Sequence, residues 1–443
     1  MIMEYQGSRG KSKCDNAKGE FANSRVVSQR TNAEREAPLG IVTKNSSPEE
    51  SQDSQQLSRA ARWALKSVAS RLLPDTRTSK CMVYRAPSLM GGLSDVTLHK
   101  GKTTGKAFYH GLMTCGSVWT CPVCAAKISE QRRKELRAAI DTATEQGMFV
   151  YFVTLTVPHG VGDDLKELVD KRASALKRMS SGKYSVKNLL RNLYPDIEVH
   201  GYVRAFEVTH GLNGWHPHFH ILVFTNSKAR RDFILNAYRA SWARACRLAG
   251  LPEPSYEHGC TVQNGAEAAK YASKWGLEDE MTKSHTKKTK RKGATPWGLL
   301  RAVLDGDDVD YEPRKATALF KSYSEVFKGR RQLHWSVGLR AKLELAKELT
   351  DEQLAEKQDD ENAMLLAIIT PEQWKIIRRL KVQSLLLDIA ELAGLQGVNA
   401  YLSSLSYVTC PIENNETQNG GRGPAPSGRV PDGFAALALT NVT

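Results

Sequence analysis

The chain has 443 residues, enough for roughly two or three domains that each bury a core of their own. Its 63 Lys and Arg residues outnumber 48 Asp and Glu residues, and the net charge of +15 favours a polyanionic partner, either nucleic acid or an anionic membrane surface. No apolar run reaches the roughly 18 residues of a membrane span, and the first residues (MIMEYQGSRGKSKCDNAKGE) lack an apolar signal segment. Composition therefore excludes a membrane-spanning protein, and we expect a cytoplasmic location.

The N-terminal part divides into a polar segment and a helical, cysteine-bearing one. Residues 1–57 are rich in Ser, Asn, Gln, Glu and Lys and poor in large apolar residues, so they cannot offset their ordering entropy and are predicted to be disordered. A helix is expected over residues 58–73 (SRAARWALKSVASRLL), before the cysteines of residues 81–124. The stretch AAKISEQRRKELRAAIDTATEQG then places apolar residues on one side and basic residues on the other, which predicts an amphipathic helix.

The cysteines form the first candidate site. Three of the eight lie close together in the sequence CGSVWTCPVC, and in a reducing compartment this bunching favours metal ligation over disulfides. A Cys-x2-Cys pair has the spacing that tetrahedral Zn²⁺ requires, and two more ligands complete a closed, structural site. The alternative is a group of free buried cysteines. The predicted ligands are Cys115, Cys121, Cys124 and Cys81, with His110 or His99 as substitutes for the last.

The middle of the chain alternates strands and helices. The aromatic and β-branched sequence MFVYFVTLTVP predicts a buried strand, and a helix is expected over residues 165–193. The sequence GYVRAFEVTHGLNGWHPHFHILVF contains turn residues between two strand patterns, which predicts a hairpin. A helix ending at Gly250, a short strand at HGCTVQ and a helix at NGAEAAKYASKWGL follow. This order predicts an α+β fold with one largely antiparallel sheet flanked by helices.

The hairpin carries the second candidate site. Side chains on a strand alternate between faces, so His218 and His220 share one face and Phe219 points to the other. If the chain turns within Gly-Leu-Asn-Gly, Glu207 lies across from His218 on that face. Two His and one Glu that leave coordination positions open suit a catalytic divalent ion. His216 has the same parity and is the alternative third ligand, and histidines without a metal are the simpler alternative.

The third candidate site is the helical sequence GAEAAKYASKWG. Glu267 and Tyr271 are i,i+4 neighbours, as are Lys270 and Lys274. A phenol with a pKa of about 10 is a poor nucleophile until cations or a metal stabilise the phenolate. Tyr and Lys are ordinary on a helix surface, so the motif gains its weight from the histidine pair.

The C-terminal third carries weaker signals. Residues 283–292 (KSHTKKTKRK) contain no acidic residue and form either a solvated loop or an arm that contacts phosphates. The sequence LLLDIAELAGLQGVNAYLSSL predicts two helices around a glycine, either a helical hairpin or a helix-turn-helix. The low-complexity tail from about residue 411 is predicted to be disordered.

Three of these motifs, in this order, resemble those of the rolling-circle replication initiators of small bacterial plasmids, which belong to the HUH superfamily of single-strand endonucleases. FVTLTV resembles the buried strand motif, HPHFHILVF the metal motif with His218 and His220 in the HUH positions, and EAAKYASK the tyrosine motif with Tyr271. CGSVWTCPVCAAKI is similar to the cysteine cluster of the plasmid branch. The resemblance covers roughly residues 75–345.

The resemblance implies a function for each motif. His218 and His220, with Glu207 or His216, would hold Mg²⁺ or Mn²⁺ at the scissile phosphate, and Tyr271 would attack it to leave a 5′-phosphotyrosyl enzyme and a 3′-OH primer. Lys274 or Lys270 would steady the phosphate or the phenolate. A second tyrosine one turn away is absent, and Glu267 stands there instead, which is typical of the single-tyrosine branch and implies a role in termination.

The implied partners are plasmid origin DNA, both duplex and single-stranded, a host polymerase and a host helicase, because no G-x4-G-K-[ST] motif for an ATPase domain occurs. The alternatives are an HUH relaxase or transposase and a non-enzymatic, zinc-containing DNA-binding regulator. The expected segments are a disordered N-terminus (1–57), a zinc-binding segment with flanking helices (58–145), the HUH nicking and joining core (146–282), a basic loop with the remainder of the initiator region (283–345), a helical C-terminal region (346–410) and a disordered tail (411–443).

Overall fold

The structure is a computed structural model that describes residues 48–226, 228, 230–265, 294–306, 311–357 and 362–407. The predicted tyrosine motif, with Glu267, Lys270, Tyr271 and Lys274, lies outside the described residues. The basic run 283–292 also lies outside them. Within the part of the chain that is described, no helix is long and apolar enough to cross a membrane.

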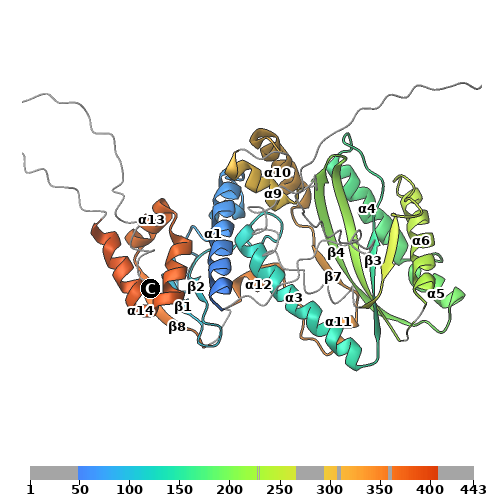
Figure 1. Cartoon of the computed structure of the whole chain (residues 1–443), viewed down its shortest axis with the longest axis horizontal. Coiled ribbons are helices and arrows are strands. Elements are labelled where there is room, and N and C mark those ends of the chain that lie inside the picture. The colour runs from blue at the N-terminus through green and yellow to red at the C-terminus, as the bar shows by residue number, and fades with distance from the viewer. Residues whose placement is uncertain are drawn as a thin grey trace, which may run out of the picture. The chain divides into compact units, whose positions relative to one another are not determined.

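A five-stranded sheet, called the central sheet below because most of its strands come from the middle of the sequence, is drawn on the right of Figure 1, and every neighbouring pair in it is antiparallel. The predicted α+β fold, with a largely antiparallel sheet flanked by helices, is therefore confirmed. The strands, in spatial order, are β6 (Cys260–Gln263), β3 (Phe149–Leu155), β5 (Gly214–Thr225), β4 (Val199–Gly211) and β7 (Leu333–Trp335). The short strand β7 comes from beyond residue 282, where the sequence analysis ended the core, because three residues are too few to give a strand pattern.

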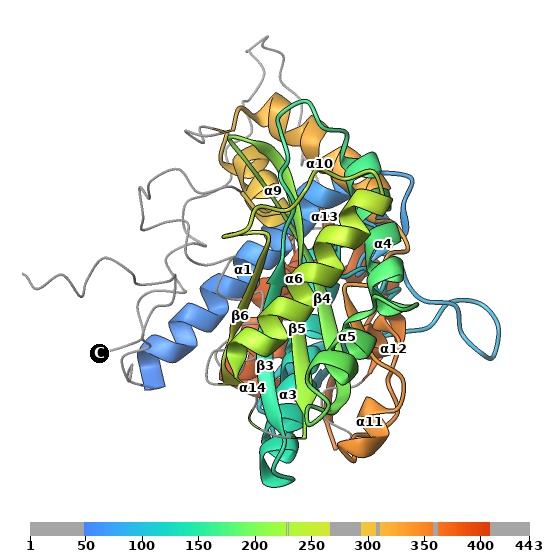
Figure 2. The same cartoon turned by 90° about the vertical axis from the view of Figure 1, so that its right-hand side faces the viewer.

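Both faces of this sheet are covered, which explains why its strands are so apolar. Phe219, Ile221 and Val223 of β5 pack in the core beneath the helices drawn in front of the strands in Figure 2. These helices are α4 (Leu165–Ser180), α5 (Val186–Leu193) and α6 (Arg231–Leu248). On the opposite face, Leu222 and Phe224 pack with the apolar side of α3 (Pro122–Glu145). The histidines of β5 lie on the α3 face, because they share the parity of Leu222.

The helix predicted over residues 165–193 is two helices in the structure. The chain leaves α4 after Ser180 and turns through Gly182, whose φ of +79° is the left-handed conformation that glycine adopts without strain. Ser185 then caps α5 by accepting a hydrogen bond from the backbone N–H of Asn188. The helical periodicity continues across this break, so it could not reveal the turn.

The helix α1 (Pro48–Leu72) begins earlier than expected, so the prediction of disorder up to residue 57 is wrong for residues 48–57. These residues include Glu, Gln and Leu, which favour a helix even without a core, and burial alone does not reveal that preference. Further short helices complete the part of the chain around the central sheet. They are α2 (Arg77–Lys80), α9 (Pro296–Asp305), α10 (Pro313–Phe327), α11 (Leu339–Lys342) and α12 (Asp351–Glu356).

A second, three-stranded antiparallel sheet joins distant parts of the sequence in the order β2-β1-β8. Its strands are β1 (Val96–Lys100), β2 (Ala107–His110) and β8 (Met364–Ile369), and α13 (Pro371–Leu380) and α14 (Gln383–Tyr407) pack on it. The expected helical region 346–410 therefore contains a strand, and part of the expected zinc-binding segment pairs with it. Gly394 is non-helical (φ 57°, ψ −147°) and separates two helical halves of α14, as the helix–glycine–helix pattern predicted.

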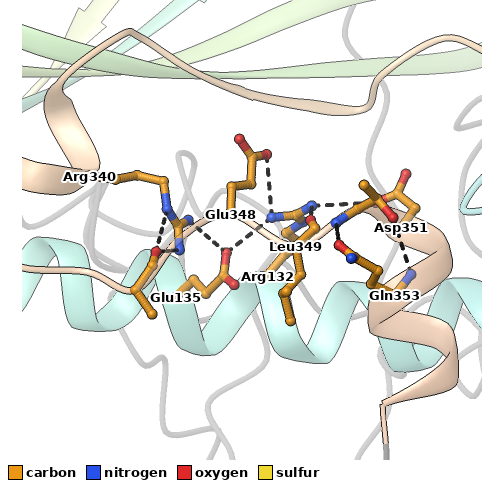
Figure 3. Close-up of polar contacts among 9 residues, drawn as sticks. Arg132, Glu135, Arg340, Glu348, Leu349, Asp351 and Gln353 are labelled. Carbon is orange, nitrogen blue, oxygen red and sulfur yellow. Dashed lines mark hydrogen bonds and ion pairs between the residues drawn. The ribbon is translucent and has the colours of Figure 1, made fainter.

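A buried arginine connects α3 to the segment that follows α11 (Figure 3). Arg132 contacts three carboxylates, those of Glu135 at 3.1 Å and of Glu348 and Asp351 at 3.5 Å. Its second terminal nitrogen also donates to the carbonyl of Leu349 at 2.7 Å. Since the guanidinium is almost wholly buried, these acceptors replace the water that it loses.

Candidate active site and metal centres

The hairpin of β4 and β5 brings the predicted ligands together. The two strands turn between Gly211 and Gly214, and Glu207 pairs directly with His218. A carboxylate oxygen of Glu207 lies 3.5 Å from Nε2 of His218 and 3.4 Å from Nε2 of His220. One ligand atom from each of the three residues lies within 4.8 Å of the others, so a single divalent ion fits between them. The sequence predicted this pairing correctly.

Neighbouring groups aim both Nε2 atoms at this point. Nδ1 of His220 is 3.0 Å from the hydroxyl of Thr154 on β3, and Nδ1 of His218 is 3.2 Å from the carbonyl of His216. With Nδ1–H as the donor in each contact, the lone pair of Nε2 is available to a metal. The ring of Phe152 stacks on His220 at 5.0 Å and fixes its plane.

Exposure and charge also suit a cation here. The side chains of His218 and His220 are only 12% and 15% exposed, whereas that of Glu207 is 36% exposed, so a substrate can approach from the carboxylate side. Burial by itself raises the pKa of Glu207. When their imidazoles are protonated, the charge and hydrogen bonds of His220 and His218 outweigh that effect and hold the pKa of Glu207 well below its ordinary value. Glu207 is therefore an anion at neutral pH.

His216 occupies a different position from the other two histidines. Its ring stacks on His218 at 4.9 Å, and its Nδ1 lies 3.3 Å from Nδ1 of His159, in the loop after β3. Burial, together with the neighbouring histidines, lowers the pKa of His216 to about 3, so its imidazole is neutral. The grouping of ligand atoms includes Glu207 and omits His216. Thr154 and His159 were not predicted from the sequence, although Thr154 lies in the buried strand motif and His159 in the loop that follows it.

The four predicted cysteines form a second cluster. All are buried, and their sulfurs lie 3.4 Å (Cys81–Cys124) to 3.7 Å (Cys115–Cys124 and Cys121–Cys81) apart. These separations are far beyond the roughly 2.05 Å of a disulfide and close to the about 3.8 Å expected between thiolates 2.3 Å from a tetrahedral Zn²⁺. Cys81, and not His99 or His110, is the fourth member. Those two histidines lie on β1 and β2, where His99 is paired with Phe108 and His110 with Thr97.

Local structure explains how four sulfurs meet. Cys121 is the N-cap of α3 and Cys124 lies in its first turn, while Cys81 ends α2. The backbone N–H of Ser117 donates to Cys115 Sγ at 3.4 Å, a contact typical of a metal-bound thiolate. Hydrogen bonds with Cys121, Cys124 and Cys81 lower the pKa of Cys115 below its ordinary value. The donor set is therefore suited to a soft divalent ion such as Zn²⁺.

The α3 helix connects the two candidate metal sites. Its first turn carries Cys124, and its apolar side further along packs on the sheet face that holds Glu207 and the histidines. The cysteine cluster thereby fixes the start of a helix that supports the other site.

Comparison with known proteins gives the family. Residues 108–378, more than half of the chain, match the family model described as "Replication protein". The chain belongs to this family. The match includes both candidate metal sites except Cys81, and the resemblance to plasmid rolling-circle replication initiators is confirmed.

Individual relatives of this replication protein are distant. A "Protein rep" of Streptomyces lividans is 26% identical over 62% of this chain and 74% of its own length, and a "Protein rep" of Lentilactobacillus hilgardii is 32% identical over 28% and 37%. A "Neomycin resistance protein" of Streptomyces cyanogenus is 31% identical over 28% of this chain and 33% of its own. No solved structure matches the chain significantly.

Proposed function

We propose that this initiator starts plasmid replication by nicking one strand of the origin through a phosphotyrosine intermediate, and rejoins that strand when a round is complete. The convergence of Glu207, His218 and His220 at one point on a substrate-accessible sheet face carries the proposal. A protein that only bound DNA would need neither this group of ligands nor a tyrosine motif later in the sequence. Membership of the replication protein family supports origin DNA as the substrate.

Each residue has a stated part in the proposed reaction. Glu207, His218 and His220 hold Mg²⁺ or Mn²⁺, which when bound would stabilise negative charge on the scissile phosphate. Thr154 and the carbonyl of His216 keep the imidazoles oriented. Tyr271 is the nucleophile.

In the nicking step, the phenolic oxygen of Tyr271 bonds to phosphorus while the bond to the 3′ oxygen breaks, and the phenol loses a proton as the 3′ oxygen gains one. The products are a 5′-phosphotyrosyl enzyme and a 3′-OH that a host polymerase extends. Lys274 or Lys270 steadies the phosphate or the phenolate. Glu267 acts in the closing step.

The cysteine cluster and the host partners have separate roles in this proposal. We expect Cys81, Cys115, Cys121 and Cys124 to bind one structural Zn²⁺, which orders the start of α3. A host helicase separates the strands, and the chain acts in the cytoplasm, where its plasmid is copied. We infer that the nicking and joining core consists of residues 146–282 together with β7, which pairs with β4.

The experiment incubates the purified chain with supercoiled origin plasmid and Mn²⁺ and follows relaxation on a gel. The wild type should relax the plasmid, and Tyr271→Phe should not, although it should bind DNA as well as before. The matched control is Tyr256→Phe, which changes an exposed tyrosine in the loop before β6 and should retain activity. A DNA-binding regulator would leave the plasmid supercoiled in every case, and unchanged nicking by Tyr271→Phe would contradict the proposal.

A second variant tests termination. Glu267→Gln should nick at the wild-type rate and fail to release closed circular product, because the carboxylate is assigned only to the closing step. Loss of the first nick in this variant would contradict that assignment.

A further inference from the structure

A hollow of about 220 Å³ lies on the helical face of the central sheet, away from the histidines. It is lined by the end of α4, the turn between α4 and α5, and α6. Three of its lining residues are cationic, one is a tyrosine and none is acidic. The cationic and aromatic lining side chains are those of Arg178, Lys183, Tyr184 and Arg244.

The aromatic ring in this hollow is available to a ligand. Tyr184 is 45% exposed, although a tyrosine of a protein interior buries most of its surface. The guanidinium carbon of Arg244 lies 4.2 Å from the ring centroid, and the ammonium of Lys183 lies 5.8 Å from it. An exposed aromatic ring beside cationic side chains is the arrangement with which proteins stack an unpaired base and neutralise the adjoining phosphate.

Hydrogen bonds order the backbone of the turn that forms one side of the hollow. The hydroxyl of Ser241 on α6 donates to the carbonyl of Tyr184 at 2.8 Å and ties the turn to the helix. The side-chain amide of Asn188 and the backbone N–H of Ser185 both donate to the carbonyl of Gly182, at 2.9 and 3.1 Å. The backbone of the turn that carries Tyr184 is thus ordered before any ligand binds, which reduces the entropy lost on binding.

We propose that this hollow, made by Arg178, Lys183, Tyr184 and Arg244, binds one nucleotide of single-stranded DNA outside the nicking site. Its volume is below the roughly 300–1,000 Å³ of a drug-sized ligand site, so a single base with its phosphate is a suitable occupant. A base in a duplex is already stacked and paired, so the site selects unpaired DNA. The inference rests on the proposed function, since it assigns a second contact to the same substrate.

The position of the hollow decides its role. Phe219 contacts Trp242 of α6 on the helical face, whereas His218 and His220 point to the opposite face. The hollow cannot reach the scissile phosphate, and it holds DNA that extends beyond the nicking site. Its loss should weaken the binding of long strands and leave the cleavage of a short strand unchanged.

The test measures the fluorescence anisotropy of fluorescein-labelled single-stranded dT20 with the full chain and no added divalent metal. Tyr184→Leu should weaken binding about tenfold, because one base–aromatic stack is lost, and Tyr184→Phe should restore it. Arg244→Ala should weaken binding and lower the slope of log K against log salt by about 0.7, because one phosphate contact is lost. The matched control is Arg247→Ala, an exposed arginine on the same helix that does not line the hollow, and it should change affinity less than twofold.

Several outcomes would overturn the inference. One is an equal effect of Arg244→Ala and Arg247→Ala, and another is an equal loss of affinity for dT20 and for its duplex. Displacement of dT20 from the hollow by dTTP or pyrophosphate at micromolar concentration would assign the site to a free nucleotide or phosphate instead. Unchanged thermal midpoints exclude unfolding as the cause. Plasmid relaxation by the wild type, measured in parallel, separates failure of this inference from failure of the proposed function.

Discussion

Replacing Arg132 by Met should destabilise the fold strongly and in a pH-dependent way. The guanidinium is almost wholly buried on α3 and is the cation that Glu135, Glu348 and Asp351 share (Figure 3). Met has a similar length and an apolar side chain, so the change removes the charge and the hydrogen bond to Leu349 while it keeps much of the packing.

The magnitude follows from what the carboxylates lose. Removal of one partner from a buried ion pair costs about 3–5 kcal/mol. The three carboxylates keep 22–28% of their side-chain surface exposed, so water compensates in part and we expect about 3 kcal/mol at pH 7. In a chain of 443 residues that corresponds to a fall of roughly 3 °C in the unfolding midpoint.

The sign of the pH dependence follows from Asp351. Burial raises its pKa, and the charge and hydrogen bond of Arg132 are the influences that oppose this increase. A carboxyl whose folded pKa is raised contributes stability at low pH and loses it as pH rises through the folded pKa. Without Arg132 the pKa rises further, so the deficit of the variant should be largest near pH 7 and should shrink toward about pH 4.

The assay is thermal and urea unfolding of both proteins at several pH values. Arg137→Met on the same helix is the control, since Arg137 and Asp141 form an exposed pair and its loss should cost at most about 0.5 kcal/mol. Equal effects of the two substitutions, or a deficit that does not depend on pH, would refute the reasoning.

Three further predictions concern the metal sites and the turn beside them. Cys124→Ser should remove about one zinc per chain in elemental analysis and lower the unfolding midpoint, as should a strong chelator; zinc content equal to the wild type would contradict the cluster. Thr154→Val should weaken Mn²⁺ binding about 10- to 100-fold in calorimetry, because His220 loses its orienting contact, and unchanged affinity would contradict that role. Gly116→Ala should destabilise the chain by more than about 1 kcal/mol in urea unfolding, since the residue has a φ of +61° and a Cβ would lie 2.8 Å from the Cα of Glu352; an unchanged midpoint would show that the turn relaxes.

The two groups of candidate metal ligands were predictable because local rules bring their residues together. The alternation of side chains and the turn residues between the strands were enough to place Glu207 opposite His218, as the register shows. The spacing of Cys121 and Cys124 likewise indicated a four-ligand cluster, and the sulfur of the predicted Cys81 lies 3.4 Å from that of Cys124.

The features that were missed depend on contacts between distant residues. Strand β8 pairs with β1 across more than half of the chain, and the apolar sequence MLLAII alone is compatible with a helix or a strand. Strand β7 is too short to show a pattern, and its place beside β4 is set by the packing of its own Leu333 and Trp335 in one core with Val203 of β4. The contact of Thr154 with His220 also required the register of β3 with β5. Such pairings follow from tertiary packing, which outweighs local propensity.

The most direct test of the account is to map the covalent adduct by mass spectrometry after reaction with single-stranded origin DNA and Mn²⁺. The account predicts a nucleotide attached to the peptide that contains Tyr271, and no adduct when Glu207, His218 and His220 are replaced by alanine together. An adduct on another residue, or strand cleavage without any adduct, would contradict it.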